Sequence, residues 1–341
     1  MADIFNKLLI LRTPGIGPAK YNALVKRFGS VADAARSLNT DVALRDAVMR
    51  EMENAQRQHV YYIDDSDERY PSTLKQVKNH SPVICVRGNL DVLQRDMVAI
   101  VGTRHATANG MQFVADIAHG LAQKNIAVVS GMAIGTDTAA HRGALRALGN
   151  NATTIAVLAG GVDYIWPLEN ESLYWEILER GAIVSEMPVG FVPVATNFVQ
   201  RNRIVAGLGQ RLILGEADMK SGSMTTARFA IDYGRDVWAI PSHPTDSRAL
   251  GPNSLIRNGQ ARLCMGLEDF VEMDEKNSNQ KKIEKKFDAD FNLIDAIGTI
   301  PVSESVLTGV VKKSISEIKS ELVVLELQGL VRKVDGGYVR N

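Results

Sequence analysis

The segment Ala127-Val128-Val129-Ser130-Gly131-Met132-Ala133-Ile134-Gly135-Thr136-Asp137 runs from a short apolar strand through a glycine-containing loop into an amphipathic stretch at 136–147. The same change from strand to helical periodicity recurs along the chain. Further strand candidates lie at 98–101, 154–158, 182–184, 211–214 and 237–240, and further helical stretches at 109–123, 169–180, 198–207 and 223–233. Such alternation predicts an α/β fold with a doubly wound, mostly parallel sheet and right-handed crossovers.

The first 60 residues follow a different pattern, because their apolar residues recur at helical spacing and predict several short helices. Between the first two helices lies the turn Thr13-Pro14-Gly15-Ile16-Gly17-Pro18. Glycines around one apolar residue resemble a helix-hairpin-helix turn, whose free backbone N–H groups can face a phosphate. A plain turn in a small structural domain is the alternative. Residues 1–60 are therefore predicted to be a small helical domain, similar to a sterile-alpha-motif (SAM) or helix-hairpin-helix domain.

Residues 61–273 carry the strand–helix alternation and form the predicted core. The following stretch, DEKNSNQKKIEKK at 274–286, is polar and charged, and it predicts an exposed linker over 274–287. Residues 288–341 show three helical segments and then a hairpin with the turn Gly336-Gly337. Three helices followed by a hairpin is the order of a winged-helix domain.

The predicted winged-helix domain is acidic, with six Lys and Arg residues against eight Asp and Glu residues. Its third helix, which would enter a DNA groove, carries a single lysine among glutamates: Lys319, Glu317, Glu321 and Glu326. Readers of duplex DNA need a basic face. We therefore expect this domain to contact protein, or to bind DNA only weakly.

The composition of the 341 residues is that of an ordinary globular protein, with 45% apolar and 23% charged residues. Basic and acidic residues both number 39, so any nucleic-acid site must be a local patch of positive charge. Cys85 and Cys264 lie in separate apolar runs and predict buried, reduced thiols. No run approaches a signal sequence or the roughly 20 apolar residues of a membrane span. We expect a soluble, cytosolic protein without a membrane partner.

Ligands of an open parallel sheet bind in the loops beyond the carboxyl ends of its strands. Here those loops are rich in Gly, Ser, Thr, Asn and Arg. The candidate binding residues that they supply are Gly102, Thr103, Arg104, Ser130, Gly131, Gly160, Gly161, Arg201, Asn202, Arg203, Lys220, Ser221, Gly222, Ser223 and Thr225. The last five open a helix after a strand, where backbone N–H groups and the helix dipole favour an anion.

The charge needed for a polyanion is concentrated in the later part of the core. Residues 196–262 hold nine Lys and Arg residues against five acids. The cations at strand ends or helix starts, which can converge on one mouth, are Arg104, Arg201, Arg203 and Lys220. Such a mouth suits a phosphate backbone. Aromatic residues that could stack on bases, with core packing as the alternative, are Tyr164, Trp166 and Phe198.

Motifs for cofactors and metals are missing. Val101-Gly102-Thr103-Arg104 departs from the G-x-G-x-x-G of a dinucleotide site, because Arg104 stands where the second glycine would be. Residues 220–227 lack the G-K-[ST] ending of a P-loop. The six histidines show no metal-ligand spacing. We therefore predict no cofactor and no metal.

Asp137 and His141 share one helix face and could be taken for an acid–base pair. No serine or cysteine nucleophile in a matching turn accompanies them. We expect instead that Thr136 or Asp137 caps the helix and that His141 packs beneath the loop. No catalytic residue is predicted, and the protein is expected not to be an enzyme.

Taken together and in order, these loops resemble the DNA-processing protein A (DprA/Smf) family. The matching stretches are Gly102-x-Arg104, Ser130-Gly131-x-Ala133-x-Gly135-x-Asp137-x-x-Ala140-His141, Gly160-Gly161-x-Asp163-x-x-x-Pro167, Ser185-Glu186-x-Pro188, Arg201-Asn202-Arg203-Ile204-x-Ala206-Gly207, Glu216-Ala217, Ser221-Gly222-Ser223 and Gly251-x-Asn253-x-Leu255-Ile256. Each stretch is weak alone, but all of them in this order are specific.

The resemblance implies a Rossmann-like core that forms a homodimer and binds single-stranded DNA. It also implies that the protein protects incoming strands and loads RecA recombinase onto them during natural transformation. The family's DNA contacts transfer first to Arg104, then to Lys220 and the pair Arg201 and Arg203. Two departures stand out: residues 161–165 lack a lysine that some members carry, and Trp166 stands where the family usually has Tyr.

Two other classes of function compete with this interpretation. A nucleotide hydrolase of the lysine-decarboxylase-like (LOG) group would carry P-G-G-x-G-T-x-x-E with a catalytic Glu. Residues 221–227 occupy the comparable place without a carboxylate. A winged-helix transcription factor with a ligand-sensing core is disfavoured by the acidic third helix.

Overall fold

The computed structural model describes residues 2–38, 40–149, 153–269, 292–298, 302–311, 313–334 and 336–341. The chain divides into two compact units, Met1–Asn277 and Ser278–Asn341. The predicted linker at 274–287 lies outside the described residues. Across the described ranges, no helix combines the length and the apolar character that a membrane crossing requires.

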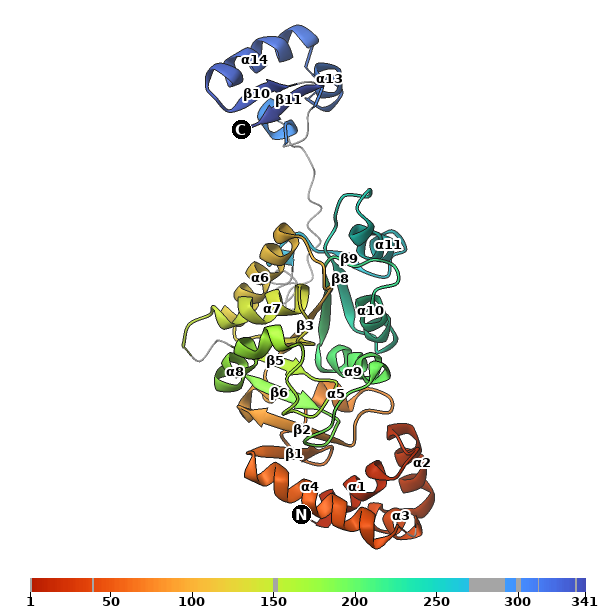
Figure 1. Ribbon diagram of the computed structural model, residues 1–341. Helices are drawn as coiled ribbons and strands as arrows, with labels where there is room; N and C mark the ends of the chain where they lie inside the picture. The colour runs from red at the N-terminus through yellow and green to blue at the C-terminus, as the bar shows by residue number, and fades with distance from the viewer. Residues whose placement is uncertain are drawn as a thin grey trace. The chain divides into compact units, whose positions relative to one another are not determined.

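One sheet forms the centre of the first unit (Figure 1). Within the described ranges its nine strands follow the order β1-β2-β6-β5-β4-β3-β7-β8-β9. They are β1 (Val60–Asp64), β2 (Val83–Gly88), β3 (Met97–Val101), β4 (Ala127–Ser130), β5 (Thr154–Val157), β6 (Ala182–Ser185), β7 (Arg211–Leu214), β8 (Asp236–Ala239) and β9 (Arg262–Leu263). All neighbours from β6 to β9 are parallel. The predicted parallel sheet is confirmed, and its strand order reverses at β3, between β4 and β7.

The antiparallel edge of this sheet was not predicted. β2 pairs antiparallel with β6, and β1 pairs antiparallel with β2. The first four residues of β2 are all buried. A strand buried on both faces shows no alternation of apolar and polar residues, so its short apolar run carries little periodic signal.

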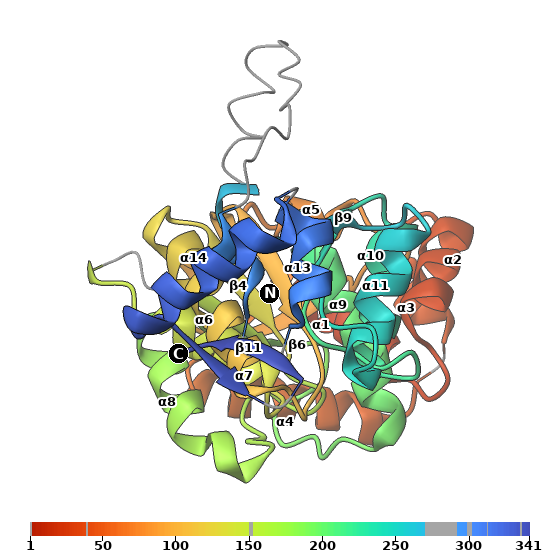
Figure 2. The same cartoon turned by 90° about the horizontal axis from the view of Figure 1, so that it is seen from above.

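Helices cover both faces of the sheet (Figures 1 and 2). The predicted helices are confirmed as α6 (Ala108–Gln123), α7 (Thr136–Leu145), α8 (Glu171–Arg180), α9 (Ala195–Leu208) and α10 (Gly222–Asp232); α5 (Ser72–Lys75) and α11 (Leu250–Arg257) are additional. Alternate residues of β3 face the two layers. Val98 and Ile100 share a core with α6 and α7, whereas Ala99 and Val101 share one with α9 and α10.

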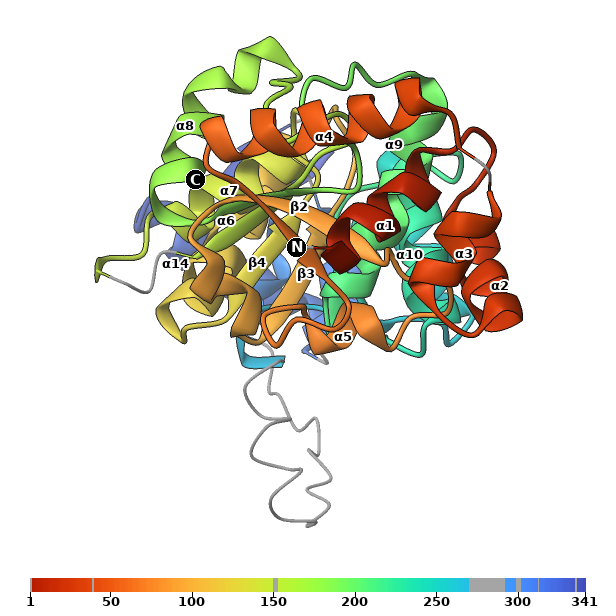
Figure 3. The ribbon, with the colours of Figure 1, turned by 90° about the horizontal axis from the view of Figure 1, so that it is seen from below.

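The N-terminal helices form a small bundle beside the β1 edge of the sheet (Figure 3). They are α1 (Ala2–Arg12), α2 (Pro18–Phe28), α3 (Val31–Ser37) and α4 (Val42–Arg57). Their core includes Leu8, Leu9, Tyr21 and Val48. The predicted turn joins α1 to α2, and Pro18 occupies the first turn of α2, where its missing N–H is not needed.

The second unit has its own core, built from buried residues that include Leu307, Ile318, Leu322 and Tyr338. Its elements are the 3₁₀ helix η5 (Leu293–Ala296), α13 (Glu304–Val311), α14 (Ile315–Leu327), β10 (Val331–Val334) and β11 (Gly337–Arg340). The first predicted helix is thus only a short 3₁₀ turn. The last two strands pair as the predicted hairpin. The assignment of this unit as a winged-helix domain remains a prediction.

Candidate nucleic-acid interface

A cleft of about 550 Å³ lies at the carboxyl ends of β3, β4 and β7, where the strand order reverses. This is the position that ligands take in open α/β sheets. The predicted residues that line it are Gly102, Thr103, Arg104, Gly131, Arg201, Asn202, Lys220, Ser221, Gly222 and Ser223. The parallel topology therefore brings together loops that lie more than a hundred residues apart in the sequence.

Five predicted residues do not line this cleft: Ser130, Gly160, Gly161, Arg203 and Thr225. Ser130 is buried and donates to the carbonyl of Ile100 at 2.6 Å. Gly160 lines a small adjoining pocket. Arg203 donates to the Glu186 carboxylate and lines a different pocket, so the predicted convergence of four cations does not include it.

Arg104 is exposed at the mouth of the cleft and stacks on an aromatic pair. Its guanidinium lies 5.1 Å from the centre of the Trp166 ring. Trp166 in turn meets Phe198 edge to face, with ring centres 4.6 Å apart. Both rings are only half-buried. They pack on each other; Phe198 lines the cleft, whereas Trp166 lines the small adjoining pocket.

The loop before α10 supplies a second exposed cation and a helix N-terminus. Lys220 is exposed, and within the described residues its ammonium makes no ion pair. Ser221 is the N-cap of α10, and its Oγ accepts the Ser223 N–H at 3.3 Å. The helix dipole adds positive potential at this point. Lys220 and the start of α10 thus form one anion-favouring corner of the cleft.

Arg201 lies at the floor of the cleft and is buried. Its Nη1 donates to the carbonyl oxygens of Gly131 and Val157. A Cβ at Gly131 would lie 2.6 Å from this guanidinium, which explains the glycine. Burial lowers the pKa of Arg201 to about 10, and Asp137 opposes that shift, so Arg201 remains a cation. Arg201 is therefore placed to hold the loops after β4 and β5 together.

Asp137 also organises the loop after β4, but not by capping α7. Its Oδ2 accepts the N–H groups of Gly131 and Ala133 at 3.1 and 3.2 Å. The N-cap of α7 is Gly135, which has φ of +81° and no room for a side chain beside the carbonyl of Thr103. The prediction that Thr136 or Asp137 caps this helix is wrong. Burial raises the pKa of Asp137, against the opposing effect of Arg201.

His141 packs beneath this loop, as predicted. It is fully buried, and its Nδ1 lies 2.7 Å from the Thr154 hydroxyl, which donates to the Val128 carbonyl. Nδ1 is therefore the donor in the first of these bonds. Burial lowers the pKa of His141 to about 3, so the ring is neutral. A neutral, buried imidazole fits a packing role.

Glu216 was not predicted as a site residue, although it fixes the loop that carries Arg104. Its buried carboxylate accepts the Thr107 N–H at 2.7 Å and the Thr107 hydroxyl at 2.5 Å. Its carbonyl accepts the Thr103 N–H at 2.6 Å. The motif Glu216-Ala217 was the available signal, but its spacing alone does not show which loop the carboxylate reaches.

The fold and the cleft together define a class of protein. The cleft lining combines three cations with two carboxylates, and Asp137 and Arg201 are buried. A ligand therefore meets the exposed Arg104 and Lys220, the exposed Asp218 and the start of α10. This is a Rossmann-like protein whose strand-end cleft suits a ligand that carries phosphate.

The chain belongs to the DNA recombination-mediator protein A family, whose model matches residues 61–274. A second model, the DprA-like N-terminal HHH domain, matches residues 1–60. Protein Smf of Escherichia coli (strain K12) is 32% identical over 294 residues, which cover 82% of this chain and 77% of that protein. The chain spans about half the length of some other curated relatives that it matches, 52% of one and 49% of another.

Two solved structures share the fold. DNA processing protein A (DprA) from Streptococcus pneumoniae superposes with a TM-score of 0.67 at 29% identity, over 79% of this chain and 97% of that one. DNA processing protein A from Helicobacter pylori, whose structure is described for its single-stranded DNA binding mode, superposes with a TM-score of 0.58 at 30% identity. The second match covers 64% of this chain and 96% of the other.

Proposed function

We propose that this chain binds single-stranded DNA in the strand-end cleft. The observation that carries the proposal is one cleft that combines exposed cations, a helix N-terminus and the half-buried ring of Phe198, which packs on Trp166 in the adjoining pocket. The similarity to the Helicobacter pylori protein, whose structure concerns single-stranded DNA, supports the same ligand.

Each part of the cleft has a role in this proposal. Arg104 and Lys220 neutralise phosphates, and the first N–H groups of α10 donate to phosphate oxygens. Trp166 and Phe198 contact the bases, for which aromatic stacking contributes about 1–3 kcal/mol per base. Bases in a duplex are stacked on each other and cannot offer this contact. The cleft should therefore prefer the single strand.

We further propose that the protein acts as a homodimer that loads RecA onto the bound strand, without catalysing a reaction. Membership of a recombination-mediator family supports the loading role.

The proposal that the protein catalyses no reaction is supported by the cleft's carboxylates. Of the two carboxylates in the cleft lining, Asp137 is buried and accepts backbone N–H groups, and Asp218 accepts the Lys220 N–H at 3.0 Å. Incubation of the protein with nucleoside monophosphates should release neither base nor phosphate.

Fluorescence anisotropy of a labelled oligo-dT strand, with a duplex competitor and a salt series, tests the ligand. The proposal predicts tight binding that the duplex competes for poorly and that weakens with salt. The expected slope is about −0.7 per phosphate contact. Absence of binding at low salt, or equal competition by the duplex, would contradict it.

RecA loading needs its own assay. RecA filament growth is followed on strands that are already coated with a single-strand-binding protein. The proposal predicts faster filament growth when this protein is added. If filament growth is unchanged although oligo-dT binding is intact, loading is refuted and the DNA-binding proposal stands.

A further inference from the structure

His105 is a cleft residue outside the set of contacts proposed for the DNA strand. It follows Arg104 in the loop after β3, and its side chain is exposed. Within the described ranges, its imidazole makes no hydrogen bond and no ion pair. The imidazole is therefore available to a ligand in the cleft.

The backbone of His105, in contrast, is held in place from two sides. Its N–H donates to the Thr103 hydroxyl at 3.2 Å. Its carbonyl accepts the Arg248 Nη1 at 3.2 Å, from the 3₁₀ helix η4 (Ser247–Ala249). The Glu216 carboxylate fastens the same loop two residues further on. Because the backbone is fixed, a ligand would have to order only the imidazole, which limits the entropy lost on binding.

The charges around this imidazole leave room for one more cation. The ionisable groups on the surrounding loops are Arg104, Glu216, Asp218, Lys220, Asp246 and Arg248. Glu216 is bonded to Thr107, and Asp246 pairs with Arg248 at 2.7 Å. In the cleft lining as described, Asp137 and Arg201 are buried. An imidazolium would thus join two exposed cations and face one exposed carboxylate, that of Asp218.

We propose that His105 binds a phosphate of the single strand when its imidazole is protonated. The inference rests on the proposed function, because it adds a contact to the same cleft. Histidine is the side chain whose charge changes between pH 5 and 8, whereas arginine and lysine stay charged throughout this range. A neutral imidazole neutralises no phosphate and releases no counterion. Affinity for the strand should therefore rise as pH falls.

Oligo-dT anisotropy at pH 8 and at pH 6, each across a salt series, tests the contact in the full chain. At pH 6 the affinity should be roughly three- to fivefold higher, the scale of one exposed ion pair. The salt slope should be steeper at pH 6 by about 0.7, the value for one added phosphate contact. Exposed carboxylates stay ionised at both pH values, so they do not contribute to the difference.

Two substitutions separate the charge of His105 from its shape. His105→Gln is polar and uncharged, so at both pH values it should bind as wild type does at pH 8. His105→Lys is charged at both, so it should bind at least as tightly as wild type does at pH 6. The matched control is His243→Gln, which replaces an exposed histidine in the loop after β8 that does not line the cleft. It should keep the pH dependence of wild type.

The outcomes separate a failure of this contact from a failure of the cleft. Equal affinity of wild type at the two pH values overturns the inference, as does a gain at pH 6 without a steeper salt slope. A pH dependence that persists in His105→Gln, or that His243→Gln removes, also overturns it. Urea unfolding at both pH values checks that each variant is folded. Absence of oligo-dT binding at pH 8 and low salt would instead contradict the proposed function itself.

Discussion

Arg104 and Arg201 line the same cleft, but burial gives them different roles. Arg104 is exposed and stacks on Trp166, so its charge is available to a ligand. Arg201 is buried, and its hydrogen bonds go to the carbonyls of Gly131 and Val157. Truncation of Arg104 should weaken ligand binding, and truncation of Arg201 should lower the free energy of unfolding.

Arg201→Met tests the structural role. The substitution leaves two buried carbonyls without a donor and Asp137 without its counter-charge. Each buried acceptor left without its donor costs about 1–3 kcal/mol, so the two carbonyls together predict a loss of about 2–6 kcal/mol. Urea unfolding should show a loss of this size, whereas Arg104→Met, the matched control, should leave the free energy of unfolding within about 0.5 kcal/mol of wild type. Equal stability of the two variants would refute the distinction.

The proposal predicts that Trp166 acts on DNA through Arg104 as well as directly, and a double-mutant cycle separates these two effects. Trp166→Ala removes a base-stacking surface of about 1–3 kcal/mol and a cation–π contact of about 0.5–1 kcal/mol, so oligo-dT affinity should fall at least about fivefold. Trp166→Phe should keep most of the affinity. In an Arg104→Ala background the loss from Trp166→Ala should be smaller, because the positioned cation is absent. Fully additive losses would show that Trp166 does not position Arg104.

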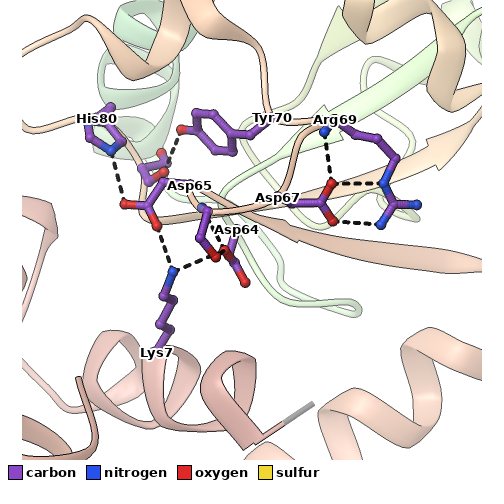
Figure 4. Close-up of polar contacts among 9 residues, drawn as sticks. Lys7, Asp64, Asp65, Asp67, Arg69, Tyr70 and His80 are labelled. Atoms are coloured by element: carbon purple, nitrogen blue, oxygen red, sulfur yellow. Dashed lines mark hydrogen bonds and ion pairs between the residues drawn. The ribbon is translucent and has the colours of Figure 1, made fainter. Parts of the chain in front are cut away.

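At the scale of elements, a buried ion-pair cluster fastens α1 to the end of β1 (Figure 4). The Lys7 ammonium lies 3.1 Å from Asp64 and 2.6 Å from Asp65, and Lys7 is only 3% exposed. Asp65 also meets His80 at 3.2 Å. Burial raises the pKa of Asp65, but hydrogen bonds from His80 and Lys7 outweigh it, so this pKa lies below its ordinary value of 3.8.

This cluster predicts an acid-sensitive contribution to stability. A carboxyl whose folded pKa is depressed stabilises the fold above its unfolded pKa, and the contribution disappears as pH falls through the folded pKa. Asp65→Asn should lower the free energy of unfolding at pH 7 by about 2 kcal/mol, the scale of a charged hydrogen bond. Urea unfolding should show that the gap in free energy of unfolding between wild type and Asp65→Asn narrows below about pH 4. A gap that stays constant down to pH 2 would contradict the assignment.

The parallel strands and their helices were predictable because each carries its own local period. The antiparallel β1–β2 edge could not be predicted. It joins residues 60–64, 83–88 and 182–185, and the pairing of strands far apart in the sequence leaves no local pattern. The cleft was predictable because parallel strands end at one edge. The orientation of the Arg203 side chain could not be predicted. It depends on hydrogen bonds to Glu186 and to Ser81, and Ser81 lies 122 residues away in the sequence.

At the scale of the whole molecule, the two units have separate cores and different surfaces. The cleft lies entirely in the first unit. Because the net charge is zero, attraction for DNA must come from a local patch of positive charge, and the proposal assigns it to the cleft. DNA binding should therefore be independent of the second unit.

Deletion of residues 275–341 tests this independence. The truncated protein should bind a short oligo-dT strand with an affinity within about twofold of the full chain, because the deletion removes no residue of the cleft lining. A strand of few nucleotides excludes avidity between copies. Cooperative urea unfolding shows that the first unit remains folded. A large loss of affinity in a folded truncation would place DNA contacts in the second unit.

The central claim is that Arg104 and Lys220 contact the phosphates of a single strand. The most direct test is the salt dependence of oligo-dT binding by the double variant Arg104→Ala and Lys220→Ala. The account predicts at least a tenfold loss of affinity and a slope shallower by about 1.4, the sum of two contacts of about 0.7 each. The control, Arg57→Ala and Lys124→Ala, replaces two exposed cations that do not line the cleft and should match wild type. A cleft variant with unchanged affinity and slope would contradict the account.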